Sequence, residues 1–314
     1  MAEWKELPLP APRRRALFPP NREHQFFQLA AEAPFLAGAT GFSWANAWWL
    51  AEASLLAYDD VERVHADFAR VQFVLPATQP VAAGTTHCYV AVGDDAVIVA
   101  FRGTEVIART SSAGWVRKAL NVAGNYLTNA QISPREVSAS VWIHKGFGEA
   151  LDEVMAPLEL LLAQYGPGRK LWLTGHSLGG ALATIAATRL PADGLYTFGA
   201  PRVGNAAFSG EVSCPSWRFT NADDIVPCVP PATPDPRLFW VPDGYDHIEQ
   251  RVHLTADEVM FAAGPEEELL LGAGLSWLTS PPWARLRRGL IHHAPLYYAA
   301  KIRNAMVRET PAPA

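Results

Sequence analysis

The five residues at positions 175–179, Gly-His-Ser-Leu-Gly, constrain the fold of this chain more than any other segment. The apolar run before them, residues 169–174, predicts a β-strand, and the alanine-rich run after them, residues 180–187, predicts an α-helix. A strand, a sharp Gly-x-Ser-x-Gly turn and a helix form the context of a nucleophile elbow. Glycine is favoured on both sides of the serine because a side chain there would clash where the backbone reverses. We therefore expect the Ser177 hydroxyl to stand above a sheet, and the Leu178 amide to lie at a helix N-terminus, where it can donate to an oxyanion.

A serine hydroxyl becomes a nucleophile when a histidine takes its proton and a carboxylate orients that histidine. In hydrolases with such an elbow the acid and then the histidine follow the serine in the chain. Order alone leaves five candidate acids, which are Asp223, Asp224, Asp235, Asp243 and Asp246. It leaves four candidate bases, which are His247, His253, His292 and His293. The first two histidines lie in residues 245–254, whose alternation predicts an edge strand, so a structural role is the simpler interpretation for them. Periodicity does not choose between His292 and His293.

Seven segments in the same order resemble those of the class 3 lipase family, which includes lipases of filamentous fungi, and the chain is similar to a bacterial-type member. They are residues 46–58, 99–104, 143–147, 175–179, 197–205, 221–227 and 293–298. The resemblance runs from about residue 45 to residue 302, which is most of the chain. It implies an α/β-hydrolase fold with a lid insertion after the oxyanion strand.

The resemblance also implies roles for particular residues. The acid of the family directly precedes an apolar-Val-Pro step, which points to Asp224. Its histidine precedes a small residue and stands five residues before a tyrosine, which points to His293, whereas His292 stands where many relatives carry an aspartate. Together with Ser177 these residues would form the catalytic triad. The residue after the Arg-Gly pair, Thr104, would be an oxyanion donor beside Leu178.

The function that the resemblance implies is a serine carboxylic-ester hydrolase, namely a triacylglycerol lipase acting through an acyl-enzyme. A carboxylesterase for soluble short-chain esters and a phospholipase A1 share this triad, and a catalytically silent lipid-binding hydrolase fold is the alternative outside enzymes. The expected partner is a lipid or ester substrate at a lipid–water interface. No metal or organic cofactor is implied. Residues 105–124 would form the lid, and a packed surface helix is the alternative for that segment.

Local patterns predict the remaining elements. Helices are expected over residues 44–58, 147–165 and 296–307, and strands over residues 86–92, 96–101, 195–198 and 217–220. Strands that alternate with helices predict an α/β fold with a mainly parallel central sheet, flanked by helices on both faces. The site of such a sheet forms at the C-terminal ends of its strands, where the loops carrying the candidate residues would meet.

Composition bounds the organisation of the chain and its partners. No linker-like run divides residues 26–314, so they are expected to form a single domain, and residues 1–25, rich in proline and charge, are expected to be a flexible arm. The net charge of −5 offers no basic patch for nucleic acid.

No apolar run reaches the roughly 18 residues of a membrane span, and no secretory signal is recognisable, so a cytoplasmic location is expected. The three cysteines show no metal-type spacing. Nothing in the sequence specifies an oligomeric state.

Overall fold

The structure is a computed structural model that describes a defined part of the chain. The described residues are 4–13, 17, 19, 21–77, 79–84, 86–103, 134–232, 244–248, 250–255, 259–262 and 288–311. The expected lid, residues 105–124, and the expected oxyanion donor Thr104 lie outside these residues.

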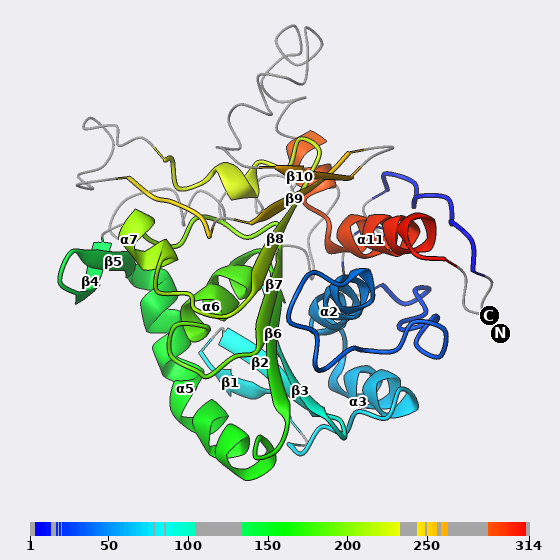
Figure 1. Ribbon diagram of the computed structural model, residues 1–314, viewed down its shortest axis with the longest axis horizontal. Coiled ribbons are helices and arrows are strands. Elements are labelled where there is room, and N and C mark those ends of the chain that lie inside the picture. The colour runs from blue at the N-terminus through cyan, green and yellow to red at the C-terminus, as the bar shows by residue number, and fades with distance from the viewer. Residues whose placement is uncertain are drawn as a thin grey trace, which may run out of the picture.

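A mixed sheet forms the centre of the molecule (Figure 1). Its strand order is β1-β2-β3-β6-β7-β8-β9-β10. The bounds are β1 (Val81–Ala83), β2 (Thr86–Val92), β3 (Ala96–Phe101), β6 (Lys170–His176), β7 (Gly194–Phe198), β8 (Ser216–Asn221), β9 (Arg251–Leu254) and β10 (Val259–Ala262). The five strands from β3 to β9 pair in parallel, and β1, β2 and β10 add antiparallel edges. A separate two-stranded sheet joins β4 (Pro134–Ser138) and β5 (Val141–His144).

Helices cover both faces of the central sheet (Figure 1). On one side lie α2 (Trp44–Leu56), α3 (Val61–Arg70) and α11 (Pro295–Glu309). On the other side lie α5 (Lys145–Tyr165) and α6 (Leu178–Ala186), with the short α7 (Ala206–Ser209) near β5. The predicted α/β fold with a mainly parallel sheet between two helical layers is therefore confirmed.

Strand β3 shows why these strands are almost continuously apolar. Ile98 and Ala100 belong to the hydrophobic core that the sheet shares with α2 and α11, whereas Val97 and Val99 belong to the core shared with α5 and α6. Because successive side chains point to opposite faces and both faces are covered, every residue of β3 is buried.

Most predicted bounds differ from the structure by one or two residues, and two of the differences have a physical explanation. Helix α5 begins at Lys145, two residues before the predicted start, because the His144 side chain caps it by accepting a hydrogen bond from the Phe147 amide at 3.3 Å. The edge strand predicted over residues 245–254 is wrong in two respects. Only Arg251–Leu254 form a strand, and β10 pairs with its outer side, so β9 lies inside the sheet.

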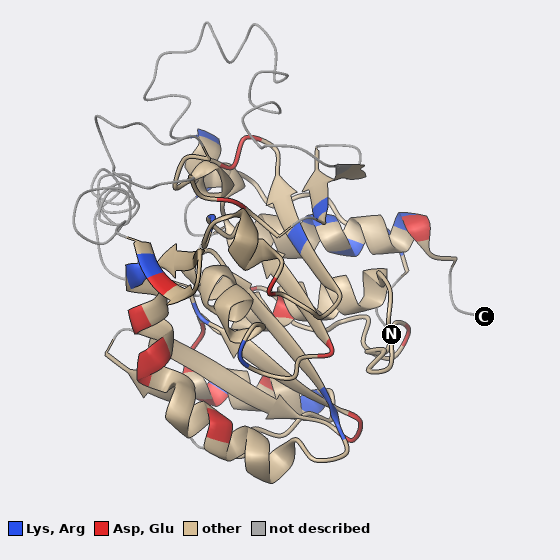
Figure 2. Ribbon diagram, turned by 60° about the vertical axis from the view of Figure 1, so that its left-hand side comes forward, with Lys and Arg blue, Asp and Glu red and all other residues tan. Residues whose placement is uncertain are grey.

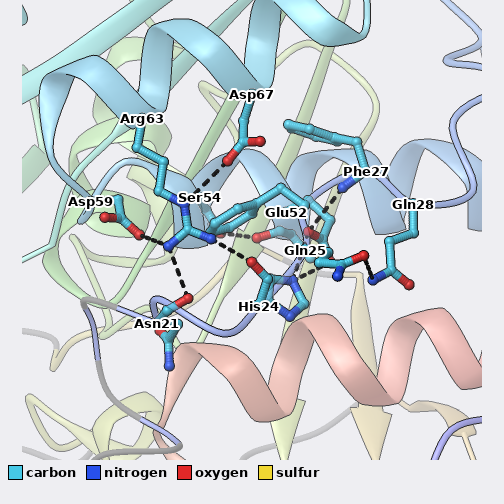
Figure 3. Close-up of polar contacts among 12 residues, drawn as sticks. Asn21, His24, Gln25, Phe27, Gln28, Glu52, Ser54, Asp59, Arg63 and Asp67 are labelled. Carbon is cyan, nitrogen blue, oxygen red and sulfur yellow. Dashed lines mark hydrogen bonds and ion pairs between the residues drawn. The ribbon is translucent and has the colours of Figure 1, made fainter.

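A buried polar cluster fastens residues 21–28 to helices α2 and α3 (Figure 3). Glu52 of α2 is only 2% exposed, and its carboxylate lies 2.9 Å from the His24 ring nitrogen Nε2. Arg63 of α3 bonds to the carboxylates of Asp59 and Asp67 at 3.0 and 3.3 Å. The same guanidinium donates to the backbone oxygens of Asn21 and His24. These charges are tolerated inside the protein because each has a partner of opposite sign.

Part of the N-terminal segment lies along α11. The Asn304 side chain accepts from the Leu7 amide at 2.9 Å and donates to the Leu7 carbonyl oxygen at 2.7 Å. Arg303 donates to the Lys5 carbonyl oxygen at 2.7 Å, and the Tyr297 hydroxyl donates to that of Pro10 at 3.1 Å. The division into an arm and one domain remains a prediction, but these contacts oppose free motion of the arm.

Charged residues of both signs are spread over several elements of the described surface, with acidic residues along the outer side of α5 (Figure 2). Within the described residues, no helix has the length and apolar character needed to cross a membrane. The described cysteines, Cys88, Cys214 and Cys228, are free thiols.

Candidate active site

The strand–turn–helix expected around Ser177 is present. Ser177 follows β6 and caps α6, with φ +58° and ψ −128°, a left-handed conformation that is rare for a residue with a side chain. A Cβ atom at Gly175 would lie 2.2 Å from the Gly179 carbonyl carbon, and one at Gly179 would lie 2.1 Å from the Phe101 carbonyl oxygen. Both glycines are thus required by close approach of backbone to backbone, as the sequence predicts.

Three side chains from distant segments form one chain of hydrogen bonds. The Ser177 hydroxyl oxygen lies 2.9 Å from Nε2 of His293, and Nδ1 of His293 lies 2.8 Å from Oδ2 of Asp224. An ionised carboxylate only accepts hydrogen bonds, so Nδ1 of His293 carries the proton and Nε2 accepts from the serine hydroxyl. That orientation leaves Nε2 ready to take the serine proton.

Asp224 is buried, with 4% of the residue exposed, and two further donors satisfy its carboxylate. The Tyr298 hydroxyl of α11 donates to Oδ2 at 2.6 Å, and the Val226 amide donates to Oδ1 at 2.9 Å. Burial, together with the nearby charge of Asp224, raises the pKa of Tyr298 well above its usual range, so this hydroxyl keeps its proton and acts as a donor. The two donors hold the carboxylate in the position from which it orients His293.

Gly199, after β7, leaves room for the Asp224–His293 pair. Its φ is +58°, and a Cβ atom there would lie 2.9 Å from Oδ2 of Asp224 and 3.0 Å from Nδ1 of His293. The position requires glycine both for its backbone conformation and for the space in front of this hydrogen bond.

His292 faces the aspartate loop rather than Ser177. Its Nδ1 accepts from the Asp223 amide at 3.1 Å, and its carbonyl oxygen accepts from the Asn221 side chain at 2.7 Å. Burial lowers the pKa of His292, although the Asp223 carboxylate acts in the opposite direction. These two hydrogen bonds fix the loop that carries Asp224 against the segment that carries His293.

The remaining candidates lie elsewhere or outside the described residues. Nε2 of His247 lies 2.7 Å from the Pro227 carbonyl oxygen, and Nδ1 of His253 lies 2.8 Å from the Thr220 hydroxyl. Asp246 accepts from the His247 amide at 2.8 Å. Asp235 and Asp243 fall outside the described residues. The structure therefore joins Ser177 to His293 and Asp224, the residues that the resemblance implies.

Leu178, one of the two expected oxyanion donors, is the first residue of α6. Amides in the first turn of a helix have no intrahelical acceptor, so its N–H is suited to an external oxygen. Thr104 follows Gly103, the last described residue after β3, and lies outside the described residues itself. The described part of the chain holds no group of three or more His, Cys, Asp or Glu side chains able to bind a metal ion.

Sequence reasoning missed four residues around this chain, namely Tyr58, His176, Gly199 and Asn221. All four stand inside segments that carry the resemblance, but nothing in their local pattern indicates which side chains they face. Tyr298 served only to set the register of His293, and its contact with Asp224 appears once α11 is packed.

Part of the chain is similar to known lipases. Residues 98–233 match the family model described as lipase (class 3). A secreted mono- and diacylglycerol lipase 1 of Fusarium solani is 35% identical over 192 residues, which are 53% of this chain and 56% of that protein. A lipase of Rhizomucor miehei is 36% identical over 165 residues, 47% of this chain and 41% of that protein. The chain thus spans about half the length of the curated relatives it matches.

Among solved structures, the native Rhizomucor miehei lipase propeptide complex is 27% identical, with a TM-score of 0.45, and the alignment covers 61% of this chain and 60% of that chain. The relatives named here are fungal, so they give no support to a bacterial-type membership. The segment of residues 98–233, which carries Ser177 and Asp224, matches the class 3 lipase family.

Proposed function

We propose that this protein is a serine carboxylic-ester hydrolase that acts on triacylglycerols. The observation that carries the proposal is the hydrogen-bonded chain from Ser177 through His293 to Asp224. The elbow geometry of Ser177 and the match to the class 3 lipase family support the same reaction class.

The proposed reaction is a two-step acyl transfer. Nε2 of His293 takes the Ser177 proton while the serine oxygen attacks the ester carbonyl carbon, and Asp224 stabilises the imidazolium that forms. The imidazolium then protonates the leaving alcohol as the carbon–oxygen bond breaks, which leaves an acyl-enzyme. Water attacks this ester, gives its proton to His293 and releases the carboxylic acid as the serine recovers its proton. The amides of Leu178 and Thr104 would bind the oxyanion, each contributing about 3 kcal/mol to lowering the barrier.

The substrate class rests on the relatives. One is named as a mono- and diacylglycerol lipase and another as a lipase, so glycerolipid esters are the substrates that we propose. Residues 105–124 are proposed as a lid that covers an apolar cleft in water and turns its apolar side to a lipid surface. A lid of this kind predicts that the enzyme is activated by an interface.

The test is the rate of tributyrin hydrolysis as a function of concentration, carried through the solubility limit, with Ser177→Ala as the control. A rise in rate when droplets form supports an interfacial lipase. Saturation below the limit, with no rise, indicates a carboxylesterase, and faster release of fatty acid from phosphatidylcholine vesicles than from tributyrin indicates a phospholipase A1. Ser177→Ala should lower kcat by about 10⁶-fold, because the nucleophile is removed.

A fluorophosphonate probe separates an enzyme from a silent fold. The probe should label the wild type and leave Ser177→Ala unlabelled, because only an activated serine attacks its phosphorus atom. A wild-type protein that neither hydrolyses these esters nor takes up the probe would contradict the proposal and favour a lipid-binding hydrolase fold.

A further inference from the structure

A histidine beside the nucleophile is not used in the proposed reaction. His176 directly precedes Ser177 at the end of β6 and is 3% exposed. Its ring centroid lies 4.5 Å from that of His293. Its neighbours come from three other segments, because Tyr58 follows α2, Gly103 follows β3 and His293 precedes α11.

The hydrogen bonds of His176 form a chain that leads from the Tyr58 hydroxyl through the imidazole ring to the His293 carbonyl oxygen. Nε2 lies 2.8 Å from the carbonyl oxygen of His293, which can only accept, so Nε2 must donate. In a neutral ring the other nitrogen is then an acceptor, and Nδ1 lies 2.9 Å from the Tyr58 hydroxyl, which must donate to it. The phenol thereby sets the tautomer of the imidazole, and the imidazole holds the backbone of His293.

This arrangement of hydrogen bonds requires an uncharged His176 ring. Burial lowers the pKa of His176 well below its usual range, and the neighbouring His293 acts in the same direction. A neutral ring at this position adds no repulsion when His293 becomes an imidazolium during acyl transfer.

The Tyr58 phenol also fills the space beside Gly103 of the oxyanion segment, residues 99–104, which ends at the expected donor Thr104. A Cβ atom at Gly103 would lie 2.0 Å from the Tyr58 hydroxyl oxygen and 2.6 Å from the His176 carbonyl oxygen. The Gly103 backbone therefore packs directly on Tyr58 and on the elbow strand. Thr104, which we propose as an oxyanion donor, is the next residue in the chain.

We propose that Tyr58 and His176 are a pair of positioning residues for ester hydrolysis, which keep the His293 base and the oxyanion segment at Gly103 in register around Ser177. Tyr58 acts through the tautomer and orientation of His176 and through its packing on Gly103. His176 acts through its hydrogen bond to the His293 carbonyl oxygen. The inference rests on the proposed function, since it assigns these residues to that reaction.

The first test is the kcat and KM of Tyr58→Phe on p-nitrophenyl butyrate below its solubility limit. We expect kcat to fall by about 10- to 100-fold with KM changed less than about threefold, because a displaced base costs transition-state stabilisation rather than binding. The rate of labelling of Ser177 by the fluorophosphonate should fall in parallel. The matched control is Tyr196→Phe, which removes another buried hydroxyl, the acceptor for the Ser43 amide at 3.0 Å, and should keep kcat within about twofold of wild type.

A second set of variants tests whether the two residues act as one unit. His176→Leu removes the donor to the His293 carbonyl oxygen, whereas His176→Gln can keep an N–H donor there. The kcat of His176→Gln should therefore be at least about tenfold higher than that of His176→Leu. The kcat of the double variant Tyr58→Phe/His176→Leu should lie within about twofold of that of His176→Leu alone, since both changes break the same chain of hydrogen bonds.

Two results would overturn the inference. One is a Tyr58→Phe protein whose kcat matches that of Tyr196→Phe at equal thermal stability. The other is a set of additive losses with no rescue by Gln, which would indicate general destabilisation. Wild-type turnover and labelling, measured in the same experiment, identify where a failure lies. If the wild type is active, only the positioning role fails. If it is inactive and unlabelled, both proposals fail.

Discussion

At the scale of single residues, the site depends on space as much as on chemistry. Asp224, His293 and Ser177 carry functional groups, yet their alignment relies on Gly199, which offers none. Its positive φ disfavours a side chain, and a Cβ atom added there would lie only 2.9 Å from Oδ2 of Asp224. A side chain in place of the glycine hydrogen atom would disturb the acid and the base together.

Gly199→Ala should therefore lower kcat on a soluble ester by about 10- to 100-fold, because the new methyl group separates Asp224 from His293. It should also lower the free energy of unfolding by about 1–2 kcal/mol, since alanine is strained at positive φ. The matched control is Gly168→Ala, at φ +79° with no atom within 4 Å of the added Cβ. That variant should lose stability by about 1 kcal/mol and keep its kcat. Equal kcat values for the two variants would show that Gly199 does not support the Asp224–His293 pair.

At the scale of helices and strands, local patterns predicted the elements well and their environments less well. The alternation and apolar runs of β3, β6 and α11 lie within the segment itself, so their positions followed from the sequence. The place of β9 did not, because β10 covers its outer side and comes from a later segment. Glu52 shows the same limit: it stands in an apolar helix, and its partner His24 comes from an earlier segment. The triad could be named through the resemblance, whereas the contacts of Tyr58, His176 and Gly199 depend on how four segments pack.

The His24–Glu52 pair makes the attachment of residues 21–28 to α2 sensitive to pH. Burial lowers the pKa of His24, but the charge of Glu52 and its hydrogen bond outweigh that effect, so the net pKa is raised above its usual value. A raised pKa in the folded state means that the pair stabilises the protein fully below the unfolded-state pKa, and that this stability is lost as the pH rises through the folded-state pKa.

We therefore expect His24→Gln to lower the free energy of unfolding by about 1–2 kcal/mol at pH about 5.5 and by less at pH about 8.5, because the stabilisation by the charged pair is lost as the pH rises through the folded-state pKa of His24. Urea unfolding of both proteins at both pH values provides the measurement. Comparing the variant with wild type at each pH removes the effects of all other titrating groups. A loss that is the same at the two pH values would contradict a charged His24 in the folded protein.

At the scale of the whole molecule, α11 connects the site to the periphery. Its first turns carry Tyr298 beside Asp224 and follow His293, and its inner face packs against α2 in the hydrophobic core. Its last turns hold the N-terminal segment through Asn304 and Arg303. Displacement of this helix would thus act on the site and on the chain terminus at once, and the segment along its outer side helps to keep it in place.

The attachment of the N-terminal segment gives the last prediction, because the sequence indicates a flexible arm over residues 1–25 whereas the contacts hold it on α11. The Leu7 amide donates to the Asn304 side chain, so its hydrogen exchange should be slower than that of an unstructured peptide by at least about 100-fold. Asn304→Ala removes both bonds to Leu7 and should bring this amide close to the exchange rate of a free peptide, while lowering Tm by about 2–4 °C. The exchange of amides in β6, in the same sample, serves as the internal control, because it reports global opening. If the Leu7 amide already exchanges at the free-peptide rate in wild type, the arm is flexible as the sequence predicts, and α11 is held by its packing on α2 and on the central sheet without help from the arm.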